Sequence, residues 1–302
     1  IHKKFGGVVP KLASREHSKN LPLLLKKACR LAKENLLDFS LKDIDIVAYT
    51  EKPGLEPCLL VGGVTAKTLA YFLDKPALPV NHIIAHIYSI LLAPIVQKNT
   101  EILKFPTIAL VASGGHTELY YLKNLFSIKK IGQTKDDAAG EAFDKGARLL
   151  GGPYPGGPYI EKLAKTGNKK LFTFPRPMLK SNDYNFSFAG LKTSLLYTLQ
   201  KMKKNEIKKN LNNLAASYQE AIVESLVLKT LKAAEDFQAA SIIIGGGVSV
   251  NARLIELFQE KIKADFPVIN LFYPPPYLTG DNAAMIGVLG AINYINDSRC
   301  LR

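Results

Sequence analysis

Two histidines, His82 and His86, lie four residues apart in a stretch whose apolar pattern predicts a helix. Positions i and i+4 share one face of a helix, so both imidazoles would point toward the same place. The chain has only five histidines, which makes this spacing uncommon by chance, and burying two imidazoles without partners is costly. The pair predicts a metal site, with two polar residues lining an apolar helix as the alternative. Ile83 stands where zinc proteases with this spacing have a glutamate, which removes the specific case for peptide hydrolysis.

A third metal ligand is offered by Asp281, in the segment 279–282 (TGDN), where a last helix is expected to begin. An aspartate at a helix start commonly caps the first turn. Its oxygen could instead complete a site of two histidines and one carboxylate that leaves coordination positions open. Both readings stay open from the residues alone.

Two glycine loops follow predicted buried strands. Residues 113–117 (SGGHT) come after the strand expected at 107–112, and residues 245–247 (GGG) come after the strand expected at 241–244. Glycine lets backbone N–H groups approach an anion closely, and a following helix N-terminus favours negative charge. Each loop alone is explained by turn geometry, and neither matches a standard phosphate-binding motif. Together they predict a phosphate or nucleotide site.

Four carboxylates stand within nine residues, from Asp136 to Asp144. Acidic residues at a helix start complement the helix dipole, which is the plain explanation. Asp144 lies more than a turn inside the expected helix, where that explanation weakens. A carboxylate there would suit the hydroxyls of a ribose.

The elements that must position these residues alternate between helices and short strands, which predicts an α/β protein with its ligand where strand ends converge. A chain of 302 residues is long enough for two modest domains. Helices are expected at 20–37 with Pro22 in the first turn, 63–73, 82–97, from about 249, and 281–295. Strands are expected at 45–49, 78–80, 107–112, 117–122 and 241–244, with a hairpin between the two strands that flank the first glycine loop.

The charge of +14 indicates an anionic partner, nucleic acid first, because basic proteins attract phosphates. Several lysines gather between Lys201 and Lys209, which a solvated helix face would also explain. Three scattered cysteines indicate a reducing compartment. No apolar run reaches the roughly 18–20 residues of a membrane span, so no membrane partner is expected.

Eight motifs occur in an order that resembles one family, the bacterial-type TsaD family of tRNA threonylcarbamoyltransferases, once labelled glycoproteases or O-sialoglycoprotein endopeptidases. The resemblance runs from Gly6 to about Ile292. The motifs are GGVVPKLASREH, NHIIAH, VASGGHTEL, DDAAGEAFDK, YPGGP, SFAGLKTS, GGGVSVN and GDNAAMI.

The resemblance implies the two-lobed actin-like fold of hexokinases and heat-shock ATPases. Lobe 1 would span 1–105, with a C-terminal helix at 281–297 packing back on it, and lobe 2 would span 106–280. Family members usually begin with a strand–turn–strand that forms a first phosphate hairpin. This chain begins at Ile1, after that position, so the expectation is an N-terminally truncated copy in which the first hairpin of lobe 1 is missing.

The resemblance also implies the site residues. The metal ligands would be His82, His86 and Asp281, holding one divalent ion per subunit, with Fe²⁺ favoured and Zn²⁺ the alternative. No catalytic residue is expected beyond this metal site. Glu161 stands where the family more often has Asp, and its longer carboxylate can still accept hydrogen bonds from a ribose. The substrate-binding positions would be Val111, Ala112, Ser113, Gly114, Gly115, Asp144, Gly157, Glu161 and Asn251.

The implied reaction moves a threonylcarbamoyl group from threonylcarbamoyl-AMP to the exocyclic amine of the adenosine beside the anticodon of tRNA. ATP or AMP analogues would bind the same cleft. The implied partners are tRNA, a TsaB-like paralogue, a TsaE-like ATPase and a TsaC-type enzyme that supplies the donor, all in the cytoplasm. An exposed apolar face on the helices after Asn20 or Leu211 is the expected docking place. Two alternatives remain: an actin-like small-molecule kinase, and a non-catalytic or truncated scaffold copy.

Overall fold

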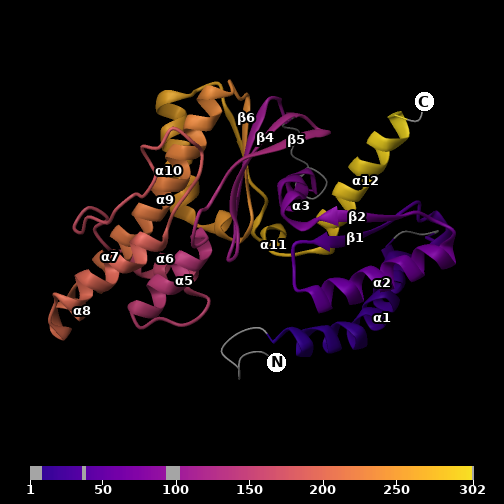
Figure 1. The fold of residues 1–302 in the computed structure, drawn as a ribbon, viewed down its shortest axis with the longest axis horizontal. Helices are drawn as coiled ribbons and strands as arrows, with labels where there is room; N and C mark the ends of the chain where they lie inside the picture. Colours follow the sequence, from indigo (N-terminus) through magenta and orange to yellow (C-terminus); the bar gives the residue numbers. More distant parts are fainter. Residues whose placement is uncertain (1–8, 36–38, 93–102, 301–302) are drawn as a thin grey trace. The chain divides into compact units, whose positions relative to one another are not determined.

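The computed structural model describes residues 9–35, 39–92 and 103–300. The chain divides into two units (Figure 1). Unit 1 comprises Ile1–Tyr88 together with Asn282–Arg302, and unit 2 comprises Ser89–Asp281. The sequence led us to expect lobe boundaries after residues 105 and 280, whereas the units of the structure meet after Tyr88 and after Asp281.

Unit 1 is built around two parallel strands, β1 (Val47–Lys52) and β2 (Ala77–Asn81). The helix α2 (Glu56–Leu73) connects them, as a parallel pair requires. The helix α1 (Pro10–Asn35) packs on α2, and α12 (Ala283–Cys300) packs on both strands and on α3 (His82–Tyr88). A short 3-10 turn, η2 (Leu41–Asp43), precedes β1. Two distant parts of the chain therefore complete one unit.

Unit 2 contains a five-stranded sheet in the order β5-β4-β3-β6-β7. β4 pairs antiparallel with both β3 and β5, whereas β6 pairs parallel with both β3 and β7. The strands are β3 (Thr107–Ala112), β4 (Thr117–Asn124), β5 (Ser127–Gln133), β6 (Ser241–Gly245) and β7 (Asn270–Phe272). The hairpin predicted around residues 113–116 is confirmed, as is the α/β class.

The helix α9 organises the core of unit 2. It packs against β3 and against the helices that precede and follow it in the chain. Of its 26 residues, 18 are buried, so it presents no polar stripe. The helical elements of this unit are η3 (Ser89–Leu92), α5 (Ala139–Leu149), α6 (Gly156–Ala164), α7 (Ala189–Gln200), α8 (Lys204–Lys209), α9 (Leu211–Asp236), η4 (Gly247–Val250), α10 (Ala252–Asp265) and α11 (Pro276–Thr279).

Several predicted helix boundaries were wrong, among them that of the helix expected at 63–73, which begins at Glu56. The first helix begins at Pro10, where proline suits the first helical position, and Pro22 lies inside it instead of in its first turn. The helix expected at 82–97 is α helical only to Tyr88 and continues as the 3-10 turn η3 to Leu92; residues 93–97 lie outside the described ranges. The helix expected from about 249 begins at Ala252, after the 3-10 turn η4. None of the helices in the described ranges combines the length and apolar character that crossing a bilayer requires.

Candidate active site

The two predicted metal-binding histidines lie on α3, which starts directly at the end of β2. The side chain of Asn81, the last residue of β2, accepts hydrogen bonds from the N–H groups of Ile83 at 2.9 Å and Ile84 at 3.1 Å. This cap fixes the first turn, which carries His82, and His86 follows one turn later. Their ring centroids are 4.9 Å apart with an interplanar angle of 79°. The i, i+4 spacing therefore brings the imidazoles together as predicted.

Asp281 is the residue at which unit 2 ends, directly before the segment that carries α12 back to α3. The cap of α12 is its neighbour Asn282, whose side-chain oxygen accepts the N–H of Met285 at 2.9 Å. One ligand atom each of His82, His86 and Asp281 lie within 4.8 Å of one another. His86 is buried, His82 half-buried and Asp281 exposed. Two imidazole nitrogens and a carboxylate oxygen form a donor set that suits a divalent transition metal with open positions.

The first glycine loop is a tight turn between β3 and β4. The N–H of Ser113 donates to the carbonyl of His116 at 2.8 Å, and the N–H of His116 donates to the Ser113 hydroxyl at 3.1 Å. A side chain at Gly140, in the first turn of α5, would come within 2.5 Å of the Ser113 carbonyl, so α5 starts directly against this turn. At Gly114 and Gly115, in contrast, a Cβ would meet nothing within 4 Å. Space is therefore open on the Cβ side of these two residues, although the N and Cα of Gly114 lie close to Gly140.

The second glycine loop leaves the neighbouring parallel strand β6 at the same edge of the sheet. Gly246 has φ +85° and ψ 170°, a conformation that is essentially restricted to glycine. A Cβ on it would lie 2.5 Å from the carbonyl oxygen of Ala112, the last residue of β3. The two loops predicted to bind phosphate therefore contact each other through Gly246 and Ala112, at the carboxyl ends of β3 and β6, where ligands of α/β sheets bind.

Asp144 and Glu161, both expected to contact the nucleotide, are connected by α6. An oxygen of Asp144 accepts the N–H of Gly156, the first residue of α6, at 2.6 Å. An oxygen of Glu161, near the other end of α6, accepts the N–H of Ala252 at the start of α10, at 3.0 Å. Each carboxylate thus satisfies a free N–H at a helix start. Gly157, beside the first of these contacts, has open space where a Cβ would stand.

Asn251 is buried and caps α10. Its side-chain oxygen accepts the N–H of Leu254 at 3.1 Å, and its amide nitrogen donates to the side-chain oxygen of Gln219 at 2.9 Å. Gln219 comes from α9 and is also buried. The pair is a hydrogen-bonded contact inside unit 2 that fixes the corner between η4 and α10. No spacing rule indicated Gln219, because it lies 32 residues away in the chain.

Next to this corner, Glu220 and Arg253 form a bidentate ion pair with N–O distances of 2.8 and 3.0 Å. Lys169 adds a contact to Glu220 at 3.2 Å. Burial alone would raise the pKa of the Glu220 carboxyl, but the hydrogen bonds and charges of Arg253 and Lys169 outweigh burial and lower that pKa below its ordinary value. The spacing of these residues in the sequence gives no sign of this cluster either, because Glu220 and Arg253 lie 33 residues apart.

The acidic segment before α5 does not act mainly on the dipole of α5, which begins at Ala139. Asp136 accepts the N–H groups of Phe188 at 2.7 Å and Ala189 at 3.1 Å, and so holds the start of α7. Asp137 pairs with Lys145 at 2.6 Å. The hydrogen bond that Lys145 donates to Asp137, followed by the one that it donates to Glu141, raises the pKa of Lys145. The prediction that these acids complement the dipole of the helix that follows them was thus partly wrong, because Asp136 accepts hydrogen bonds at the start of α7.

A family model described as tRNA N6-adenosine threonylcarbamoyltransferase matches residues 1–288 of the chain. Proteins of the same description are 46% identical in Thermosipho africanus (strain TCF52B), over 96% of this chain and 83% of that protein, and 48% identical in Thermosipho melanesiensis, over 96% and 84%. The corresponding protein of Listeria monocytogenes is 43% identical over 99% of this chain and 83% of its own length.

Two solved structures share the fold. A full-length HypF in a phosphate- and nucleotide-bound form superposes with a TM-score of 0.59 at 14% identity, over 83% of this chain and 46% of that one. HypF from T. kodakarensis gives 0.57 at 15% identity, over 84% and 41%. This chain therefore spans less than half of either HypF, and the likeness concerns architecture alone.

Proposed function

Because the chain belongs to the family of tRNA N6-adenosine threonylcarbamoyltransferases, we propose that it transfers a threonylcarbamoyl group from threonylcarbamoyl-AMP to the N6 amine of the adenosine beside the anticodon in tRNA. Family membership over nearly the whole chain carries this proposal. The donor is a mixed anhydride with a good leaving group, so binding and orientation supply much of the required rate enhancement. The amine of the tRNA attacks the carbamoyl carbon directly, and AMP leaves.

His82, His86 and Asp281 would hold one divalent metal ion, with Fe²⁺ favoured over Zn²⁺. The donor set and the 4.8 Å grouping of its ligand atoms fit such an ion. When bound, the ion would act as a Lewis acid toward the oxygens of the threonylcarbamoyl group. The Asn81 cap contributes by fixing the turn that carries the first histidine.

In the nucleotide half of the proposed site, the backbone of residues 111–115 and of Gly157 would receive the adenylate phosphate. Their support is the open space at Gly114, Gly115 and Gly157. Asp144 and Glu161 would present carboxylate oxygens to ribose hydroxyls beside the helix starts that they already hold. Asn251 would contribute mainly by fixing the start of α10, because both ends of its amide are engaged inside the protein. ATP or AMP analogues would occupy the same place.

Partner proteins would dock on unit 1. Large apolar side chains are exposed on both of its first two helices, whereas α9, the other expected docking helix, is buried at most positions. Large apolar side chains gathered on the surface are a feature of protein interfaces. A TsaB-like paralogue is the proposed occupant, with a TsaE-like ATPase and a TsaC-type donor supplier completing the system in the cytoplasm. The exposed residues are Leu23, Leu24, Leu25 and Leu31 on α1, and Leu60, Val64, Tyr71 and Phe72 on α2.

The proposal is tested by reconstitution. The full chain is incubated with the three partner proteins, threonine, bicarbonate, ATP and unmodified tRNA, and the modified nucleoside is sought by mass spectrometry. Metal content is measured separately by elemental analysis. We expect product and about one metal ion per chain, and the loss of both in a variant with His82→Ala and His86→Ala.

His17→Ala, at a histidine exposed on α1, is the matched control for metal content and should retain the metal ion. Full product from the double histidine variant would overturn the metal assignment. No product from the unaltered chain, or phosphorylation of a small molecule without tRNA, would overturn the transferase in favour of the scaffold or kinase alternative.

A further inference from the structure

Five exposed lysines stand after the end of α7 and along α8, in a nine-residue stretch that holds one glutamate. We call them the α8 lysine cluster. Elsewhere in unit 2, lysines such as Lys145 and Lys169 are paired with carboxylates. In the described parts of the chain, no member of the cluster forms an ion pair, so its positive charge is uncompensated. The members are Lys201, Lys203, Lys204, Lys208 and Lys209.

The stability of α8 does not explain the cluster. Cations are favourable at the C-terminal end of a helix, where Lys208 and Lys209 lie, but unfavourable at the N-terminal end, where Lys203 and Lys204 lie. The single acid, Glu206, accepts the N–H of Lys203 at 2.7 Å and so caps the helix. Two of the lysines therefore oppose the local electrostatics of the helix that carries them.

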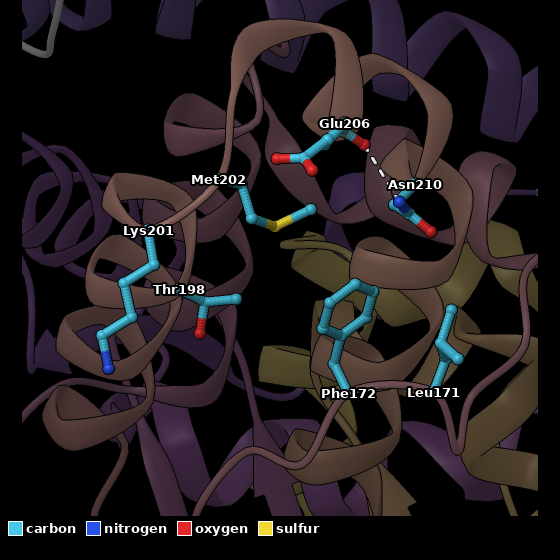
Figure 2. A pocket seen from close by; sticks show the side chains of 7 residues that line it. All are labelled: Leu171, Phe172, Thr198, Lys201, Met202, Glu206 and Asn210. Atoms are coloured by element: carbon cyan, nitrogen blue, oxygen red, sulfur yellow. Dashed lines mark hydrogen bonds between the residues drawn. The ribbon is translucent and has the colours of Figure 1, made fainter.

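A pocket of about 530 Å³ opens beside the cluster (Figure 2). Leu171, Phe172 and Met202 give it apolar walls, and Lys201 of the cluster stands at its rim. The ring of Tyr197, one helical turn before Lys201, is 57% exposed. Lysines bind phosphates, and aromatic or apolar surfaces take up bases, so this combination fits a nucleic acid.

The cluster lies well away from the predicted nucleotide-binding loops. Asp136, three residues before α5, holds the start of α7 at Ala189. From there α7 runs for 12 residues, or about 18 Å at 1.5 Å per residue. Figure 1 shows α8 beyond the far end of α7, at the extremity of unit 2. An RNA that offers one base to the reaction extends much farther than the reacting base, so a phosphate-binding surface at this distance is within its reach.

We propose that the α8 lysine cluster binds the phosphate backbone of the tRNA substrate at a distance from its reacting adenosine, and that the adjoining pocket takes up a neighbouring base. This inference rests on the proposed function for the identity of the RNA. The contact is electrostatic, so it contributes affinity and orientation without reading sequence.

The test compares two variants of the full chain that each lose four positive charges. One replaces Lys203, Lys204, Lys208 and Lys209 with Gln. The control replaces four exposed lysines elsewhere in unit 2 with Gln, namely Lys104, Lys123, Lys129 and Lys263. Binding of fluorescent unmodified tRNA is followed by anisotropy at several salt concentrations. Each lost phosphate contact should reduce the slope of log K against log salt by about 0.9.

For the cluster variant we expect a slope smaller by about 2–4 and a Kd at least about tenfold higher at roughly 0.15 M salt. The control should bind within about twofold of the unaltered chain. Native affinity in the cluster variant would overturn the proposal and leave an acidic protein as the better candidate. Equal weakening in the control would overturn it too, because the effect would then reflect net charge alone.

The modification assay separates this inference from the function on which it rests. If the unaltered chain forms the modified nucleoside, the cluster variant should have a higher KM for tRNA than the unaltered chain and the same kcat. Absence of product from the unaltered chain, together with cluster-dependent binding, would refute the proposed reaction and leave the surface standing. Product formation with unchanged KM in the cluster variant would refute the surface alone.

Discussion

Replacing Asn251 with Ala removes two contacts at once, and their cost can be worked out from the structure. The side chain caps α10 through the N–H of Leu254, and loss of such a cap costs about 1 kcal/mol. It also donates to Gln219, which is only 6% exposed. A buried acceptor left without its donor costs about 1–3 kcal/mol. We therefore expect unit 2 to lose about 2–4 kcal/mol of its free energy of unfolding.

Asn251→Asp is the informative control. Aspartate caps a helix as well as asparagine does, and the Gln219 amide can turn to donate to it, so the loss should stay below about 1 kcal/mol. The assay is urea denaturation, with hydrogen exchange of the α10 amides as the local readout. A loss below about 0.5 kcal/mol in the Ala variant, or an equal loss in both variants, would show that the buried amide pair does not hold this corner.

Two other substitutions probe the same end of the sheet. Gly246→Ala forces a side chain into a glycine-only conformation against the carbonyl of Ala112 and should cost about 1–3 kcal/mol of stability. Thermal unfolding measures this, with Gly247→Ala as the control because a Cβ there meets nothing. A fall in unfolding temperature no larger than that of the control would contradict the prediction. Glu220→Gln should destabilise the protein most at neutral pH. Arg253 and Lys169 lower the pKa of this carboxyl in the folded protein from 4.5. The ionised carboxylate therefore adds to the free energy of unfolding above pH 4.5, and this stabilisation is lost as the pH falls through the lowered pKa. Denaturation at stepped pH should show the gap closing in acid, and a constant gap from pH 7 to about pH 3.5 would refute this.

Sequence patterns predicted the three central strands of the unit 2 sheet, β4, β3 and β6, because they are apolar runs next to glycines, whereas the edge strands β5 and β7 were not predicted. The strand over Thr107–Ala112 and its hairpin partner were identified at nearly their full length. The histidine pair was found for a similar reason, since helical spacing alone decides which side chains share a face. Local chemistry was sufficient in both cases.

Long-range partners could not be predicted in the same way. Gln219 and Arg253 interact with residues that lie 32 and 33 positions away, and the spacing carries no trace of these contacts. The helix α9 was hard to delimit because most of its faces are buried, which removes the apolar–polar period that reveals a helix. Asp281 was one candidate for the cap of α12, and the side chain of its neighbour Asn282 accepts the N–H of Met285 instead. Adjacent polar residues at a helix start are interchangeable in sequence, and only the backbone distinguishes them.

Unit 1 is assembled from both ends of the chain, which has a consequence for its synthesis. Residues 89–281 leave the ribosome after β2 and α3 but before α12. At 5–20 residues per second, roughly 200 intervening residues take about 10–40 s to translate. Throughout that time the faces of β1 and α3 that α12 will cover have no helix to pack against. Unit 2 can fold while it is being translated, whereas unit 1 is completed only after α12 has been made.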